Sequence, residues 1–230
     1  MPTILPRFVL SVALVACAMT GFAAEEEGFK PLFDGKTLEG WKQHGGKAKY
    51  AVENGEVVGT SVPNTTNSFL CTTKDYGDFI LEVEFKVDPT LNSGVQIRSQ
   101  VYDKETEVEI AGKKKKFPAD RVHGYQVEID PGTRAWSGGI YDEGRRGWLF
   151  DLKNNEAARK AFKQGEWNKF RIEARGDSIK TSINGVPAAD LKDGLTPKGL
   201  IALQVHGVGA KTDPLEVRWR NIRIKELDAK

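Results

Sequence analysis

The stretch that decides the fold is "HGYQVEID", residues 123–130, in which apolar and polar side chains alternate. Successive side chains of a β-strand face opposite sides of a sheet, so this pattern separates two sets. We expect the apolar set to pack in a core. The polar set combines an amide with two carboxylates, a grouping that a solvent-facing strand does not need. The apolar set is Tyr125, Val127 and Ile129, and the polar set is Gln126, Glu128 and Asp130.

Strand-like segments recur at short spacing along most of the chain, and turn pairs such as Asn184-Gly185 and Asp193-Gly194 separate them. One helix is predicted within 154–165, with Asn154 or Asn155 as its N-cap and Gly165 beyond its end. We therefore predict an all-β sandwich with one short helix. The predicted strands lie within 50–60, 68–73, 79–88, 94–101, 124–130, 138–142, 168–175, 178–185, 199–207 and 215–227.

The chain length and its charge favour one domain without a polyanionic partner. A chain of 230 residues suits a single β-sandwich, and a formal net charge of +2 gives no field that would attract nucleic acid. The basic run Lys113–Lys116 follows Glu107 and Glu109, so we interpret it as one solvated arm of an excursion from the sheet.

The N-terminal residues 1–24 have the pattern of an export signal, with Arg7, then an apolar run, then small residues. We expect an exported protein, periplasmic or extracellular. Two forms stay open. Cleavage near Ala23 or Ala24 gives a soluble protein, whereas "LVAC" at 14–17 resembles a lipobox that would make Cys17 a lipid anchor. No membrane association is predicted otherwise.

Three strands carry a polar set of unusual composition. Each combines a planar hydrogen-bonding amide with a charged or titratable group, whereas strands such as 79–88 carry mixed charges typical of a solvated face. If these three strands are neighbours, they form a floor that suits the vicinal hydroxyls of a sugar. The alternative is a polar network that only holds two sheets apart. The floor residues are Gln96, Arg98, Gln126, Glu128, Asp130, Gln204 and His206, and the candidate apolar walls are Trp136, Tyr141 and Trp148.

Metal and cofactor motifs are weak. The three histidines, His44, His123 and His206, have no paired ligand spacing, and no Gly-rich phosphate or dinucleotide loop occurs. Asp130 and Asp142 could hold Ca²⁺, but surface carboxylates are far commoner than calcium sites. We predict no metal and no cofactor.

Several motifs together resemble the secreted bacterial 3-keto-disaccharide hydrolase family. They are "PLFDGKTLEGW" (31–41), "NSGVQIR" (92–98), "GYQVEID" (124–130), "GGIYD" (138–142), "GEWNKFRIEARGDSIKTSINGVPAAD" (165–190), "GLIALQVHG" (199–207) and "VRWRNIRIKEL" (217–227). The resemblance spans nearly all of the predicted domain, 28–228. It implies a concanavalin-A-like jelly-roll sandwich of two antiparallel sheets, whose concave sheet binds carbohydrate. Many relatives carry Glu then Gln where this chain has Gln126 then Glu128.

The resemblance also implies a reaction, in which a C3 ketone acidifies the C2 proton and the C1 substituent leaves by elimination. Glu128 is the candidate base and His206 the candidate acid. Arg98, with Gln96 or Gln204, would hold the ketone or enolate oxygen, and His123 is a reserve proton carrier. An upstream sugar 3-dehydrogenase would supply the oxidised substrate.

Two other functions fit the same residues. A non-catalytic sugar-binding module would need the same floor and aromatic walls. An ordinary two-carboxylate glucanase is suggested by "EIDPGT" (128–133), but Thr133 stands where a third carboxylate is expected and Pro131 interrupts the strand.

Overall fold

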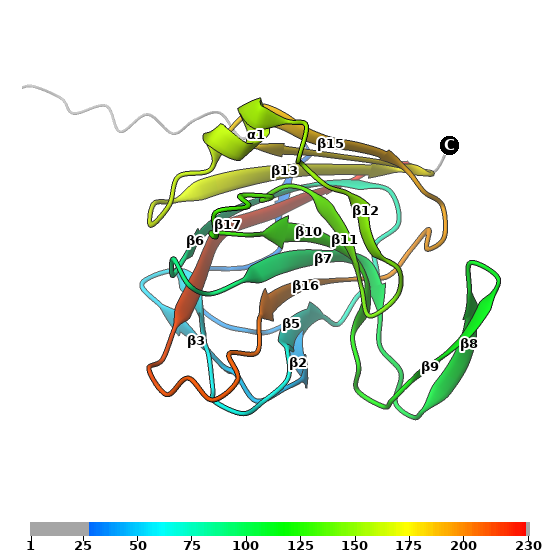
Figure 1. Ribbon diagram of the computed structural model, residues 1–230, viewed down its shortest axis with the longest axis horizontal. Coiled ribbons are helices and arrows are strands. Elements are labelled where there is room, and N and C mark those ends of the chain that lie inside the picture. Colours follow the sequence, from blue (N-terminus) through cyan, green and yellow to red (C-terminus); the bar gives the residue numbers. More distant parts are fainter. Residues whose placement is uncertain (1–27, 229–230) are drawn as a thin grey trace, which may run out of the picture.

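The structure, a computed structural model, describes residues 28–228 as two antiparallel β-sheets packed face to face, with one short helix (Figure 1). This confirms the predicted all-β sandwich. Across the eight-stranded sheet the order is β15 (Val186–Lys192), β14 (Ser178–Ile183), β13 (Asn168–Arg175), β6 (Phe79–Val87), β17 (Glu216–Glu226), β4 (Glu56–Thr60) and β3 (Lys49–Glu53), and β1 (Lys30–Pro31) pairs with β17. Across the seven-stranded sheet it is β12 (Gly147–Phe150), β11 (Ile140–Glu143), β10 (His123–Ile129), β7 (Ser93–Gln100), β16 (Leu200–Val205), β5 (Ser68–Thr72) and β2 (Trp41–Gly45).

The core lies between the two sheets. Tyr125, Val127 and Ile129 of β10 point into it and are fully buried, as their alternation predicts. From the opposite sheet, the rings of Phe85 and Phe170 lie 4.5 Å apart between centroids. Burying a side chain of this size stabilises the fold by roughly 1.5–3 kcal/mol. The three strands that carry the polar set, β10, β7 and β16, are adjacent in one sheet, so their polar face is continuous.

The helix α1 (Glu156–Ala161) begins at Asn155, one of the two predicted caps. The Asn155 Oδ1 accepts a hydrogen bond from the Ala158 amide, which satisfies one of the free N–H groups at a helix start. Its Nδ2 donates to the carbonyls of Pro187 and Ala188 in β15. One side chain therefore both starts the helix and attaches it to the edge of the eight-stranded sheet.

A β-bulge in β7 changes the face on which Arg98 lies. Arg98 has φ +46°, and the register of β7 against β10 shifts between His123 and Tyr125. The extra residue turns the Arg98 side chain away from the polar face, because a bulge interrupts the two-residue alternation. Its guanidinium is fully buried and donates to the carbonyls of Gly77 and Gly176 and to Asp78. The prediction that Arg98 lies on the polar face with Gln96 is wrong.

The strands β8 (Thr106–Ile110) and β9 (Lys113–Phe117) form a separate hairpin that projects from the sandwich (Figure 1). Its charges pair across the hairpin, with Lys114 Nζ 3.0 Å from a Glu107 carboxylate oxygen, as the solvated-arm interpretation anticipates. Lys115 Nζ instead donates to the Arg145 carbonyl at 2.7 Å and attaches the hairpin to the β11–β12 turn.

The predicted export signal and Cys17 lie outside the described residues. Within 28–228, none of the helical structure has the length and hydropathy that a membrane crossing requires.

Candidate functional site

The polar face of the seven-stranded sheet contains a directed chain of hydrogen bonds. The Ser99 hydroxyl donates to Gln96 Oε1 (2.7 Å), Gln96 Nε2 donates to Gln126 Oε1 (2.6 Å), and Gln126 Nε2 donates to Glu128 Oε2 (2.8 Å). Gly94 leaves room for it, because a Cβ there would lie 2.5 Å from the Gln126 side-chain carbon Cδ. We call these four side chains the floor relay. It ends on one carboxylate.

Glu128 is the titratable end of this relay. The residue is 4% exposed, and its second oxygen accepts a hydrogen bond from Asn92 Nδ2 at 2.7 Å. Burial raises the pKa of Glu128 to about 7, and the hydrogen bonds from Asn92 and Gln126 offset only part of that effect. Nearby Asp130 raises it further, whereas Arg134, whose Nη2 lies 3.5 Å away, lowers it. A carboxyl group with this pKa exchanges protons near neutral pH.

Aromatic side chains form one wall beside Glu128. Trp148 packs edge-on against both Trp136 (4.8 Å between centroids) and Tyr141 (5.3 Å). The Arg134 guanidinium lies over both tryptophan rings, 4.8 and 5.0 Å from their centroids. Asp130 holds Arg134 there through a 2.7 Å ion pair with Arg134 Nε. The wall therefore presents apolar rings and one oriented cation to the same space.

His206 and Glu143 also line that space. His206 is exposed, and its Nδ1 lies 2.8 Å from the Gly207 carbonyl. A carbonyl only accepts, so Nδ1 carries a proton and Nε2 is the nitrogen left for chemistry. Glu143 is 6% exposed, and its Oε1 accepts from Arg121 (2.6 Å) and Asn67 (3.5 Å). Burial raises the pKa of Glu143 above its ordinary value, and Arg121 and His206 oppose that rise.

These side chains surround one open cavity of about 250 Å³. It combines two buried carboxyl groups, an imidazole, a guanidinium, two amides and two aromatic rings. Such a set can bind hydroxyl groups, move protons and stabilise a negative oxygen. The lining residues are Asn92, Gln126, Glu128, Arg134, Tyr141, Glu143, Trp148 and His206.

Five of the nine predicted site residues line this cavity. They are Gln126, Glu128, Tyr141, Trp148 and His206.

The other four do not line the cavity. Gln96 and Gln204 are fully buried in the floor, Gln96 as a member of the relay and Gln204 with no hydrogen-bond partner for either amide atom. Asp130 is turned to the loop that follows β10, where it accepts from the Gly132 and Trp136 amides and from Arg134. Arg98 lies in the interior, as described above.

His123, the predicted reserve proton carrier, is also misplaced. It is 1% exposed and stacks on Phe117 with 3.7 Å between ring centroids. Burial, then the nearby cations Arg145, Arg121 and Lys115, lower its pKa to about 4, so it is neutral at pH 7. The structure gives it a packing role.

Three cavity residues were missed from the sequence: Asn92, Arg134 and Glu143. Asn92 precedes β7, and Arg134 belongs to an irregular loop, so alternation gives no signal for either. Glu143 has a signal, because it lies two residues after Tyr141 in β11 and therefore shares its face.

Among residues 28–228, His, Cys, Asp and Glu side chains form no group of three that could hold a metal ion.

Comparison with known proteins places the chain among carbohydrate-related β-sandwiches. Residues 28–225 match the model of the 3-keto-alpha-glucoside-1,2-lyase-like domain. None of the curated proteins matches the chain.

Solved structures share the fold at low identity. A candidate glycosyl hydrolase from Parabacteroides distasonis has TM-score 0.58 and 20% identity, over 88% of this chain and 95% of that one. The carbohydrate-binding module CBM66 from Bacillus subtilis has TM-score 0.55 and 14% identity, over 81% and 96%. A Bacillus subtilis protein of unknown function with a galectin-like fold has TM-score 0.56 and 10% identity, over 88% and 96%.

Proposed function

The chain belongs to the 3-keto-alpha-glucoside-1,2-lyase-like family, and on that premise we propose that it cleaves the glycosidic bond of 3-keto-disaccharides or 3-keto-glycosides. The observation that carries the proposal is the buried Glu128 carboxyl group. It has a pKa of about 7 and lines a cavity together with aromatic rings and hydrogen-bonding groups. The family supplies the substrate class, and the cavity supplies the chemical groups.

The reaction begins with loss of a proton. A ketone at C3 acidifies the C2–H bond, and a base that removes this proton leaves the electron pair in an enolate. The pair then forms the C1=C2 double bond while the C1–O bond breaks, and the glycosidic oxygen leaves with its electrons and takes up a proton. Addition of water across the new double bond would complete a net hydrolysis.

Glu128 acts as the base in this proposal. A carboxylate with the ordinary glutamate pKa of 4.5 would be a weak base. A pKa of about 7 makes Glu128 a stronger base that is still ionised in about half of the molecules at pH 7. The floor relay holds the carboxylate in place, so it needs little reorientation.

His206 acts as the acid that protonates the leaving oxygen. Nδ1 is committed to the Gly207 carbonyl, so a proton on Nε2 is the one available for transfer. Glu143 lines the same cavity as His206.

Arg134 takes the role that the sequence assigned to Arg98. It is the cavity's guanidinium, and it is held over the rings of the wall by Asp130. A fixed cation of this kind stabilises the negative charge that develops on the enolate oxygen.

The proposal includes export of the protein and an upstream sugar 3-dehydrogenase, which would supply the oxidised sugar. The sequence has no dinucleotide-binding loop of its own that would assign this oxidation to the same chain.

The test incubates residues 25–230 with a 3-keto-disaccharide and with its unoxidised parent, and follows the released sugars by mass spectrometry. Cleavage of the keto-sugar alone, slowed by deuterium at C2, is the expected result. Cleavage of the parent would instead favour a glycosidase that uses Glu128 and Glu143 as its carboxylate pair. Binding without cleavage of either sugar would make the cavity a lectin site.

A further inference from the structure

The cavity around Glu128 is small for a disaccharide. Small-molecule sites in proteins usually enclose roughly 300–1,000 Å³, whereas this cavity has about 250 Å³. It suits one sugar ring beside the base and the acid. The rest of a longer substrate has to lie outside it.

A second cavity, of about 530 Å³, adjoins the first. The two are separated by the Glu143–Arg121 ion pair, in which Glu143 lines the first cavity and Arg121 the second. The chain also passes directly from one to the other, since Gly144 lines the second cavity immediately after Glu143. A substrate that extends from the first cavity past Glu143 would therefore reach the second.

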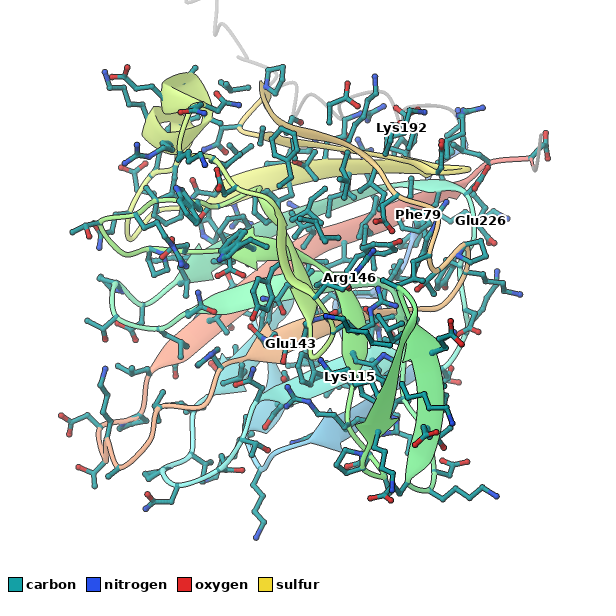
Figure 2. The ribbon with its side chains drawn as sticks, turned by 45° about the vertical axis from the view of Figure 1, so that its right-hand side comes forward. Phe79, Lys115, Glu143, Arg146, Lys192 and Glu226 are labelled. Carbon is teal, nitrogen blue, oxygen red and sulfur yellow. The ribbon has the colours of Figure 1, made fainter. Side chains whose placement is uncertain are left out.

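The β8–β9 hairpin explains why the second cavity exists. Lys116 and Phe117, at the end of β9, form part of its wall, and the loop 118–121 continues that wall. The Lys115 ammonium attaches this hairpin to the Arg145 carbonyl, two residues after Glu143. Lys115 and Glu143 are both labelled in Figure 2, which shows them on the same side of the molecule. Two lysines of the run Lys113–Lys116 thus contribute to the second cavity, Lys115 by attaching the hairpin and Lys116 by lining the wall.

The groups in the second cavity suit a neutral sugar ring. A hydroxyl, an ammonium, a carboxylate and a guanidinium offer both donors and acceptors to vicinal hydroxyls. Asp120 is already fixed by the Gly45 amide (2.9 Å) and by His44 Nδ1 (2.5 Å), so it is held in place before any ligand arrives. The groups belong to Thr66, Lys116, Asp120 and Arg121.

We propose that the second cavity is a subsite for the leaving-group side of the substrate, so that the preferred substrates carry at least one further sugar beyond the cleaved bond. This inference rests on the proposed function, because it takes the ring beside Glu128 as the oxidised one. Asn67 links Glu143 to the residue after His206, because its Nδ2 lies 3.5 Å from Glu143 Oε1 and its Oδ1 accepts from the Gly207 amide at 3.0 Å. The proposed acid is therefore near Glu143, so the leaving group is on the side where the second cavity begins.

The test compares three ligands with the same 3-keto-glucose ring: its methyl glycoside, a disaccharide and a trisaccharide. Affinities are measured by calorimetry in a Glu128→Gln background, which prevents turnover. We expect the trisaccharide to bind at least about tenfold more tightly than the methyl glycoside. Ala119→Trp, which places an indole in the second cavity, should reduce this ratio to near one. Ala210→Trp adds the same side chain at an exposed position outside both cavities and should keep the ratio.

Equal affinities for all three ligands, or an equal loss for all three in Ala119→Trp, would overturn the subsite. Turnover by the wild-type protein is measured in parallel. If no keto-sugar is cleaved but affinity still grows with length and Ala119→Trp removes that growth, the proposed function fails, and the second cavity stands as a binding site for a further sugar ring.

Discussion

Glu82 and Glu128 are each 4% exposed, one on each sheet of the sandwich, and their pKa values are shifted in opposite directions. Burial raises the pKa of both. At Glu82, on the outer face of the eight-stranded sheet, hydrogen bonds from Lys169, Arg223 and Arg171 override burial and lower the pKa to about 2. At Glu128 the hydrogen-bond donors are the neutral amides of Asn92 and Gln126. They and the Arg134 guanidinium, 3.5 Å away, offset only part of the effect of burial, so the pKa rises to about 7.

The comparison shows that burial alone does not define a catalytic carboxylate. A buried carboxylate with several cations is permanently ionised, and its effect is structural. One with neutral donors can gain and lose a proton, because each donor stabilises the anion less than a full charge would. Five experiments would break or sharpen this contrast.

The largest effect is expected from Glu128→Gln. The amide keeps the shape of the side chain but cannot accept a proton, so kcat/KM for a 3-keto-disaccharide should fall by about 10³-fold. Initial rates of sugar release measure this. Glu82→Gln is the matched control and should retain turnover per folded molecule. Near-normal turnover in Glu128→Gln would move the base to another residue.

The pH dependence of the wild-type protein should follow Glu128. Since the base works only when ionised, kcat/KM should rise about tenfold per pH unit on the acidic side of pH 7 and gain nothing further from Glu128 above it. At pH 5, protonation of Glu128 should lower kcat/KM about 100-fold relative to the fully ionised base. A profile that is flat between pH 5 and 8 would contradict the assignment.

Glu82→Gln should destabilise the fold by about 2 kcal/mol. Removing one partner of a fully buried ion pair costs roughly 3–5 kcal/mol, but the three cations here stay partly exposed and are rehydrated. Urea unfolding at pH 7 gives the value, with Glu84→Gln as a control for a more exposed carboxylate, which pairs with Arg220.

The same two glutamates should have opposite pH signatures in stability. The pKa of Glu82 is below the ordinary 4.5, so its contribution is present above that pH and is lost as the pH falls towards 2. The pKa of Glu128 is above 4.5, so its contribution is complete below that pH and is lost as the pH rises through 7. Glu128→Gln should therefore gain stability relative to wild type between pH 5 and 8.

The smallest effect is expected from Asn92→Ala. Asn92 donates to the Glu128 carboxylate at 2.7 Å and favours its charged form. Without this bond, the pKa of Glu128 should rise by about one unit. The midpoint of the pH–rate profile reports the shift, and Asn154→Ala, an exposed asparagine, should leave the midpoint in place. An unchanged midpoint in Asn92→Ala would mean that the amide only packs against Glu128.

Alternation was sufficient to predict the sandwich and the strand that carries Glu128, because a strand with one buried face fixes the face of every residue. It failed at Arg98, where one bulged residue reverses the face, and at Asp130, where the strand ends and the chain turns. It could not find Asn92 or Arg134, which reach the cavity from irregular segments. Their positions depend on tertiary contacts such as the Asp130–Arg134 ion pair.

The floor relay has a direction, since every donor in it points toward Glu128. Each hydrogen bond polarises the next one in the chain, so a change at Ser99 affects the carboxylate through three hydrogen bonds. The direction also survives exchange of the last two side chains: with Glu at 126 and Gln at 128, Gln96 would donate straight to the carboxylate. The polar face thus has two positions, 126 and 128, that can carry one buried carboxylate, about 6–7 Å apart along the strand. Moving the carboxylate from one to the other would not require changes in the rest of the sheet.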